Sequence, residues 1–339
     1  MLIAHLTVKW IGVILTVKLG TGITDIINHE RQDSLFRRRF KNLYKDRYAL
    51  LLLFPVLLHL FIFCYIPIYG ISISFRDFQM GDSFFALGQD ANWVGFKHFI
   101  DFFQSMYFVR VMRNTVLNSV LTLLIGFWIP IIFALLLNEV VHKKFKKVVQ
   151  SVSSLPYFIS SVVIVGIVIS FVNKDGLINN IIELLGGQRV QLLNEPQYFR
   201  IIYILMHIWQ HFGWSAVLYL AAISSVSPAL YESADIDGAN RWQKMWNITL
   251  PGIVPTIVVM LILAIGTLLN SDTERILLLY NPLIYETADV IGTYIYRIGL
   301  IKCEYSYSAA VGLFTNAVNL VLVILANKIS NRVSNYSLW

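Results

Sequence analysis

The fold is decided by a stretch that contains no Asp, Glu, Lys or Arg, TVLNSVLTLLIGFWIPIIFALLLN at positions 115–138. An α-helix rises about 1.5 Å per residue, so this stretch is long enough to cross the roughly 30 Å hydrocarbon core of a bilayer. Further stretches without these charged residues cover 48–71, 154–173, 201–228, 253–271 and 308–327. The sequence therefore predicts an all-α polytopic membrane protein with six transmembrane helices.

The composition of the whole chain agrees with this class. Of 339 residues, 57% are apolar and only 14% are charged, and the mean hydropathy is +0.64. Soluble domains carry about 25% charged residues, so a soluble globule of this size would expose more charge than the chain has. The apolar content also excludes a disordered chain, and the presence of only two cysteines, Cys64 and Cys303, excludes a disulfide scaffold.

The distribution of Lys and Arg sets the expected orientation. With the N-terminus in the cytoplasm, 17 of the 27 Lys and Arg residues fall on the cytoplasmic side and 10 on the other side. Segment 1–47 contains the strongest basic cluster and is expected to be cytoplasmic or interfacial, so the net charge of +7 predicts contact with membrane lipid and no nucleic-acid partner. Residues 48–339 are expected to form one six-helix domain with both termini cytoplasmic. For residues 2–17 an interfacial helix, a misassigned start and an extra span remain open.

The loop 226–251, between the fourth and fifth spans, has the local chemistry of a helix–turn–helix. Ser227, which precedes a proline, is suited to cap a first helix, and Gly238 is suited to end it in the left-handed conformation. Asn240 is expected to cap the next helix with Gln243 in the capping-box position. The first helix is acidic, with Glu232, Asp235 and Asp237. It is either a docking element for a basic groove on a cytoplasmic partner or an ordinary amphipathic connector.

The same loop resembles the signature of ABC importer permeases, in which Glu-Ala-Ala, Gly and Ile-x-Leu-Pro recur at fixed spacing. The matching positions are Glu232, Ala234, Gly238, Ile248, Leu250 and Pro251, and Ser233 replaces the first alanine. In that family the short helix before the glycine is the coupling helix, which sits in a cleft of a cytoplasmic ATPase. The resemblance implies an ATPase-coupling element made of Glu232, Ser233, Ala234, Asp235, Asp237, Gly238, Ala239, Ile248, Leu250 and Pro251.

The resemblance covers roughly residues 36–339 and extends to the sugar-uptake branch, of the maltose and LplB-like kind. Stretches typical of this branch are WVG at 93–95, LPYFIS at 155–160, YLAA at 219–222 and YNP at 280–282. The chain departs from the pattern at 271–274, where SDTE stands in place of the usual Gly-Phe-Glu.

Membership of this branch implies a membrane-spanning permease subunit of an ATP-driven, binding-protein-dependent importer of an oligosaccharide, complex or acidic. It also implies a place in the bacterial cytoplasmic membrane, a second homologous permease, two copies of a cytoplasmic ABC ATPase and an extracytoplasmic solute-binding protein. The chain itself is expected to be no enzyme and to hold no cofactor, because it contains no Gly-x-x-x-x-Gly-Lys-Ser/Thr loop for ATP phosphates. ATP and Mg²⁺ then belong to the partner ATPase.

Polar and aromatic side chains within the spans are candidates for the substrate path, since sugars offer hydroxyls to amides and apolar ring faces to aromatics. The higher-ranked candidates are His211, Trp214, Asn270 and Asn316, and the lower-ranked ones are Trp209 and Asn319. At about 100° per residue, His211 and Trp214 share a helix face that excludes Trp209. For each residue the alternative is an interhelical hydrogen bond without contact to substrate.

His207 and His211 have metal-competent spacing, but no carboxylate or thiol adjoins them in sequence, so no metal site is predicted.

Two other classes of function remain as alternatives. An ion-coupled secondary sugar carrier usually places ionisable groups inside its spans, and an intramembrane enzyme needs a catalytic set near the interface. The predicted spans lack Asp, Glu, Lys and Arg, and the acids of the outer loops show no fixed spacing. The sequence names neither the saccharide nor the residues that touch it.

Overall fold

The computed structural model describes residues 47–85, 91–270, 272–334 and 336–338. Contacts within the chain divide it into two compact units, Met1–Ile68 and Tyr69–Trp339. The expected N-terminal segment, its basic cluster and the apolar residues 2–17 lie outside the described residues, apart from Arg47.

The described part of the first unit is an apolar helical segment. Helix α3 spans Arg47–Leu60, the π-helical turn η2 spans Phe61–Tyr65, and the 3-10 helix η3, Ile66–Phe75, continues into the second unit. Apart from Leu60, the described side chains from 47 to 68 are exposed, although most of them are apolar. A helix that is apolar on every side is suited to lipid and not to water.

Six helical segments among the described residues are long and apolar enough to cross a membrane, which confirms the predicted number. They are Leu50–Phe75, Phe108–Asn138, Ser161–Leu184, Pro196–Ser224, Arg241–Gly266 and Tyr305–Val333. Several of them extend beyond the charge-free stretches, because a helix continues for as long as its backbone groups find hydrogen-bond partners. The second span thereby includes Arg110 and Arg113, and the fourth includes Arg200.

The second unit is built around the long helix α10, Pro196–Ser224. The other long helices are α5 (Phe108–Gly126), α6 (Trp128–Asn138), α7 (Lys143–Ser154), α8 (Ser161–Val172), α13 (Leu250–Gly266) and α17 (Tyr305–Ser334). The shorter elements are α4 (Lys97–Gln104), η5 (Leu155–Phe158), α9 (Leu177–Leu184), η6 (Leu192–Asn194), α11 (Pro228–Ile236), α12 (Arg241–Lys244), η7 (Met245–Thr249), α14 (Thr273–Leu279), η8 (Pro282–Ile284), α15 (Tyr285–Ala288), α16 (Ile291–Ile295) and η9 (Tyr296–Ile301). Over the described ranges, the only β-type pairing is an isolated bridge between Arg76 and Trp93.

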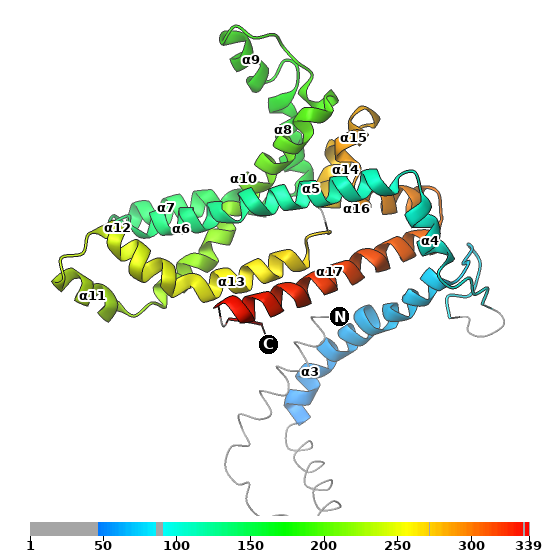
Figure 1. Cartoon of the computed structure of the whole chain (residues 1–339), viewed down its shortest axis with the longest axis horizontal. Coiled ribbons are helices and arrows are strands. Elements are labelled where there is room, and N and C mark those ends of the chain that lie inside the picture. Colours follow the sequence, from blue (N-terminus) through cyan, green and yellow to red (C-terminus); the bar gives the residue numbers. More distant parts are fainter. Residues whose placement is uncertain (1–46, 86–90, 271, 335, 339) are drawn as a thin grey trace, which may run out of the picture. The chain divides into compact units, whose positions relative to one another are not determined.

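Helix α10 contacts α5, α6, α7 and α13, and α13 packs against α17. Helices α11 and α12 lie at one end of this unit and α4 lies at the opposite end (Figure 1). A side chain at Gly213 would collide with the backbone of Ser153 and Ser154, so glycine allows α10 and α7 to cross closely. Buried apolar clusters join α10 to α6 and α13 and also to α8 and α14, which fixes α10 along most of its length.

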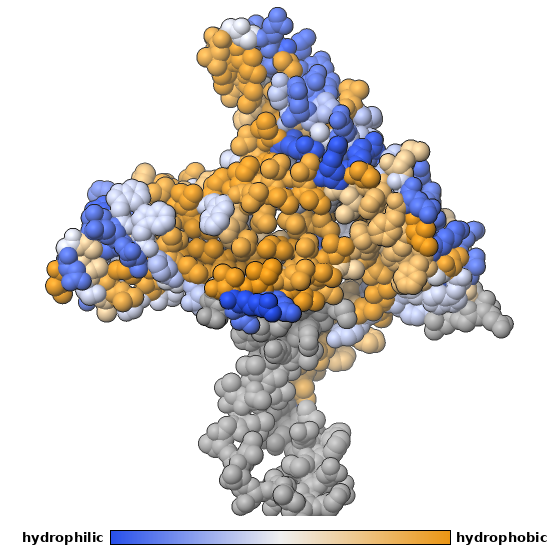
Figure 2. All heavy atoms as spheres, in the orientation of Figure 1, coloured by the Kyte–Doolittle hydropathy of each residue, from blue (hydrophilic) through white to orange (hydrophobic). Residues whose placement is uncertain are grey.

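The surface of the second unit is mainly apolar between its two ends. Figure 2 shows an apolar band over α5, α6, α13 and α17, with hydrophilic residues gathered over α11 and α12 at one end and near α4 at the other. Large apolar side chains such as Leu124, Ile132, Leu263 and Ile324 are exposed on these helices. Apolar surface of this extent faces lipid or a partner subunit.

Candidate functional site

A cavity of about 470 Å³ opens between α5, α6, α10 and α13. One face of α10 forms its long wall, because residues at intervals of four positions lie on the same side of a helix. These wall residues are Tyr203, His207, His211, Ser215 and Tyr219. Polar residues of the other walls are Ser119, Thr122, Thr267, Asn270 and Asp272. A cavity that offers hydroxyl, imidazole and amide groups beside apolar surface suits a polyhydroxylated ligand.

The two histidines of this wall form a stacked pair with ring centroids 4.3 Å apart. Nδ1 of His211 lies 2.9 Å from the backbone carbonyl oxygen of His207, and because a carbonyl only accepts, Nδ1 donates this bond. Nε2 of a neutral His211 is then left to accept a hydrogen bond from a ligand hydroxyl. Nδ1 of His207 is buried without a partner, and no group of three metal-binding side chains occurs among the described residues.

The structure separates the predicted path residues of α10. His211 lines the cavity, as does Asn270 beyond the end of α13. Trp214 is not part of the lining, and its ring stacks on Tyr157 with centroids 5.1 Å apart. The His211 ring lies 5.7 Å from the same Tyr157, so His211 and Trp214 do share a helix face. Trp209 lines a different, apolar pocket between α8 and α10.

The two predicted asparagines of α17 differ in their surroundings. Asn316 is exposed, whereas Asn319 is buried. Nδ2 of Asn319 donates to Oδ1 of Asn270 at 3.1 Å, and its Oδ1 accepts from the backbone N–H of Leu269 at 3.0 Å. Asn319 therefore holds the chain that follows α13 and touches the cavity lining only through Asn270.

Several lining residues carry no signal of their own in the sequence. Hydroxyl-bearing residues are common in membrane helices, so single ones such as Ser119, Thr122 and Ser215 do not stand out. The available signal is the recurrence of polar residues at intervals of four from Tyr203 to Tyr219, which defines one helix face. Asp272 lies in the segment that departs from the family pattern, and it pairs with Arg275.

We expect His211→Ala and Asn319→Ala to impair transport in different ways. The first removes a cavity group, so uptake should fall by about 10-fold while the melting temperature of the purified complex stays the same. The second removes two bonds between α17 and the chain that follows α13, each worth about 0.6–2 kcal/mol, so uptake should fall in step with the melting temperature. Uptake assays beside thermal unfolding of each complex check this, and a fall in both quantities for His211→Ala would contradict a lining role.

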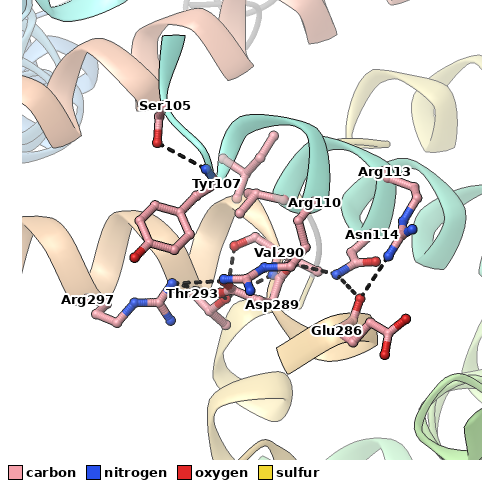
Figure 3. Close-up of polar contacts among 12 residues, drawn as sticks. Ser105, Tyr107, Arg110, Arg113, Asn114, Glu286, Asp289, Val290, Thr293 and Arg297 are labelled. Atoms are coloured by element: carbon pink, nitrogen blue, oxygen red, sulfur yellow. Dashed lines mark hydrogen bonds and ion pairs between the residues drawn. The ribbon is translucent and has the colours of Figure 1, made fainter. Parts of the chain in front are cut away.

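A polar cluster centred on Asp289 lies beside the N-terminal part of α5 (Figure 3). Asp289 is fully buried, and its carboxylate accepts from Arg110 at 3.0 Å, from Arg297 at 2.9 and 3.0 Å and from the hydroxyl of Thr293 at 3.1 Å. Burial lowers the pKa of Arg297, but its hydrogen bond to Asp289 and the charge of that carboxylate raise the pKa above its usual value. The buried charge of Asp289 is thus paired on two sides.

Two asparagines of α5 extend this cluster towards α10. Nδ2 of Asn114 donates to the backbone carbonyls of Glu286 at 2.8 Å and Asp289 at 3.1 Å, and Nδ2 of Asn118 donates to that of Thr287 at 3.2 Å. The Thr287 hydroxyl donates a hydrogen bond of 2.8 Å to the backbone carbonyl of the first residue of α10. The segment that contains α15 is therefore bonded to both α5 and α10.

At the opposite end of α10, the loop 226–251 forms the expected helix–turn–helix. Gly238 has a φ of +76°, which is the left-handed conformation predicted for the end of α11. Asn240 and Gln243 form the predicted capping box, with reciprocal bonds of 2.9 and 2.7 Å. The predicted side-chain cap at Ser227 is wrong, because this hydroxyl makes no capping bond. The Leu230 N–H, which a side-chain cap at Ser227 would bind, donates to the backbone carbonyl of Ser227 instead, at 3.2 Å.

Helix α11 is uncovered, and none of its residues is buried. The exposed members of the predicted coupling set are Glu232, Ser233, Asp235, Asp237, Gly238 and Pro251, and the half-buried members are Ala234, Ala239, Ile248 and Leu250. Asp235 pairs with Lys244 at 2.6 Å, and the Tyr231 hydroxyl lies 2.9 Å from that of Thr249. These two contacts fix α11 against the start of the fifth span.

The fold and these sites define a class of protein: a polytopic helical membrane protein with a polar cavity between its spans and an exposed helix at one end. Residues 126–335 match the family described as binding-protein-dependent transport system inner membrane component. The chain belongs to this family, whose members are the permease subunits of ABC importers. It is thus a multi-pass inner-membrane protein, and the importer is favoured over the carrier and the enzyme.

Curated relatives cover almost the whole chain. The polygalacturonan/rhamnogalacturonan transport system permease protein YteP of Bacillus subtilis (strain 168) is 42% identical over 89% of this chain and 94% of its own length. Protein LplB of the same organism is 40% identical over 88% of this chain and 92% of its own length.

Two solved structures have the same fold. A chain from a bacterial ABC transporter involved in the import of the acidic polysaccharide alginate has a TM-score of 0.80 and 43% identity, covering 88% of this chain and 99% of that chain. A chain from a bacterial alginate ABC transporter in complex with alginate pentasaccharide-bound periplasmic protein has a TM-score of 0.80 and 42% identity, covering 89% and 100%. The predicted six-helix importer permease fold is confirmed.

Proposed function

We propose that this chain and a second homologous permease together form the path of an importer for acidic oligosaccharides. An extracytoplasmic solute-binding protein delivers the saccharide, and two copies of a separate cytoplasmic ATPase bind ATP and Mg²⁺. The relatives support this substrate class, since one is described as a polygalacturonan/rhamnogalacturonan permease and another belongs to an importer of an acidic polysaccharide. The polar cavity along α10 supplies groups that suit sugar hydroxyls.

One observation carries the proposal: a single helix joins the cavity to the exposed loop. The face of α10 from Tyr203 to Tyr219 lines the cavity, and only three residues separate its end at Ser224 from the start of α11 at Pro228. A helix without a kink bends only gently, so a displacement of α11 moves the cavity wall as well. ATP-driven motion at α11 is thereby coupled to the substrate path.

The exposed face of α11 supports docking to the ATPase. Glu232 and Asp237 carry uncovered negative charge, whereas Asp235 is already paired with Lys244. Leu230 and Ile236 add apolar surface, and Ile236 is 88% exposed. We expect a partner groove with an apolar floor and basic residues at its rim.

This proposal places the α11 end and both termini in the cytoplasm of a bacterial cell. Helix α6 ends and α7 begins on the α11 side (Figure 1), so the basic start of α7 lies on that side too. Its lysines are Lys143, Lys144, Lys146 and Lys147. Such an excess of positive charge is typical of cytoplasmic loops.

Reconstitution tests the proposed function. The chain is expressed with its second permease, its ATPase and its binding protein, and the purified complex is placed in lipid vesicles. A labelled oligogalacturonate or oligoalginate should accumulate only with ATP on the ATPase side and binding protein on the other side. Accumulation without ATP, or driven by an ion gradient, would contradict the proposal.

We also expect the chain alone to bind no ATP, because it contains no phosphate-binding loop. The measurement is equilibrium binding of a labelled ATP analogue to the contaminant-free subunit, with the assembled complex as the positive control. Saturable binding to the isolated subunit would place a nucleotide site on this chain and contradict the assignment of ATP to the partner.

A further inference from the structure

Four arginines contact the segment around α15 or the asparagines bonded to it, and they fall into two groups. Arg110 and Arg297 share the carboxylate of Asp289. Arg113 and Arg200 differ, since no carboxylate of the described residues lies within ion-pair distance of either. Their donors instead reach neutral oxygen atoms. This part of the molecule therefore carries two positive charges that no contacting carboxylate neutralises.

The guanidinium of Arg200 is held in a fixed position. Its Nε donates to Oδ1 of Asn118 at 3.1 Å, and its Nη2 donates to Oδ1 of Asn114 at 3.2 Å. Both amides are fixed in turn, because their Nδ2 atoms donate to backbone carbonyls of the α15 segment. Nη1 of Arg200 has no acceptor among the described residues and is left for a ligand. A fixed guanidinium loses little conformational freedom on binding an anion.

Arg200 lies close to the cavity, although it is not one of the lining residues. It stands one helical turn before Tyr203, the first lining residue of α10, and its partner Asn118 precedes the lining residue Ser119.

Arg113 is exposed, and its Nη2 donates to the backbone carbonyl of Glu286 at 3.2 Å (Figure 3). Arg113 donates to the backbone carbonyl of Glu286, and Arg200 reaches the same carbonyl through Asn114, so their like charges lie near each other and repel. A bound anion would relieve the repulsion.

We propose that Arg200, assisted by Arg113, binds a carboxylate group of the saccharide as it enters the cavity. This inference rests on the proposed function and adds the residues that select acidic sugars. A planar guanidinium matches a carboxylate in geometry and forms charge-assisted bonds with it. Tyr203 and His207 follow within two turns of α10 and are placed to meet the hydroxyls of the same or the next sugar ring.

The test uses the complete importer in vesicles of neutral lipid, with an oligogalacturonate and its uncharged methyl ester as substrates. Arg200→Gln keeps a donor for the asparagines but removes the charge, and it should slow uptake of the acid about 10-fold. Arg113→Gln should slow it about 3-fold. Neither variant should lower the ester rate, and Arg113→Gln should leave the melting temperature unchanged. Arg189→Gln is the matched control with unchanged uptake, because Glu183 and Asp175 already neutralise that arginine.

Three outcomes would overturn the inference. Uptake of the acid by Arg200→Gln at the rate of the unmodified complex would show that the charge is not used. Losses that affect both substrates alike and follow the melting temperature would make Arg200 a packing residue. Defects that appear only with anionic lipid would assign the site to a lipid phosphate.

Two further results keep the test decisive. If the complex with Arg200→Gln does not assemble, the Arg113→Gln variant is used to test the inference, because the Arg113 side chain is exposed and contacts only a backbone carbonyl. Unchanged uptake of the acid by the Arg113→Gln complex then overturns the inference. Failure of the unmodified complex to take up any oligosaccharide with ATP would defeat the proposed function itself.

Discussion

Asp289→Ala is expected to destabilise the assembled importer strongly. The change leaves Arg110 and Arg297, whose side chains are only 33% and 20% exposed, without their shared carboxylate. Removing one partner of a buried ion pair costs about 3–5 kcal/mol, because the remaining charge stays poorly solvated. The melting temperature of the detergent-purified complex should fall by about 5–10 °C, with a matching loss of assembled complex on size-exclusion chromatography.

Two other aspartate variants show whether burial is the cause. Asp289→Asn retains hydrogen-bonding groups and should melt between the unmodified complex and Asp289→Ala. Asp175→Ala removes an aspartate that is 89% exposed and pairs with Arg189 at 3.0 Å, so it should cost only about 0–1 kcal/mol. Equal melting of Asp289→Ala and Asp175→Ala would show that the buried cluster does not stabilise the fold.

Changes in the loop of α11 are expected to abolish coupling while the membrane domain stays intact. Glu232→Lys reverses an exposed charge that faces the proposed basic groove, so the ATPase should dissociate or hydrolyse ATP without uptake. Gly238→Val forces a β-branched residue into a φ of +76° and strains the turn by about 1–2 kcal/mol. The measurements are retention of the ATPase on the purified permeases and the ratio of sugar taken up to ATP hydrolysed.

Gly186→Val is the matched control for the strained turn. Gly186 has a φ of +85°, and like Gly238 it has no atom within 4 Å of where a Cβ would stand, so both variants carry similar strain without collision. Gly186 follows α9, away from α11 (Figure 1), and its variant should retain both ATPase binding and uptake. Uptake at the unmodified rate by both Glu232→Lys and Gly238→Val would rule out α11 as the coupling helix.

The sequence alone determined the membrane class, the six spans and the local form of the loop. These features depend on residues that are neighbours in the chain: a run without charges such as 115–138 can only be stable in a bilayer or a core, and Gly238 and the pair Asn240 and Gln243 act within one helical turn. The side-chain cap expected at Ser227 is absent, because the backbone carbonyl of Ser227 accepts the Leu230 N–H that the hydroxyl would have bound.

The tertiary structure alone decided which polar residues meet. The charge-free stretches 115–138 and 201–228 begin after Arg110, Arg113 and Arg200. These arginines nevertheless belong to the helices, since a long arginine side chain near a helix end can extend its charged group towards polar surroundings.

Asn114 and Asp289 are 175 positions apart, and Asn319 and Leu269 are 50 apart, so their contacts depend on how α5, α17 and the intervening loops pack. The same packing turned His211 into the cavity and Trp209 into an apolar pocket. The rotation of each helix about its own axis is set by the packing of all the neighbouring helices together. The hydropathy pattern of the sequence does not specify this rotation.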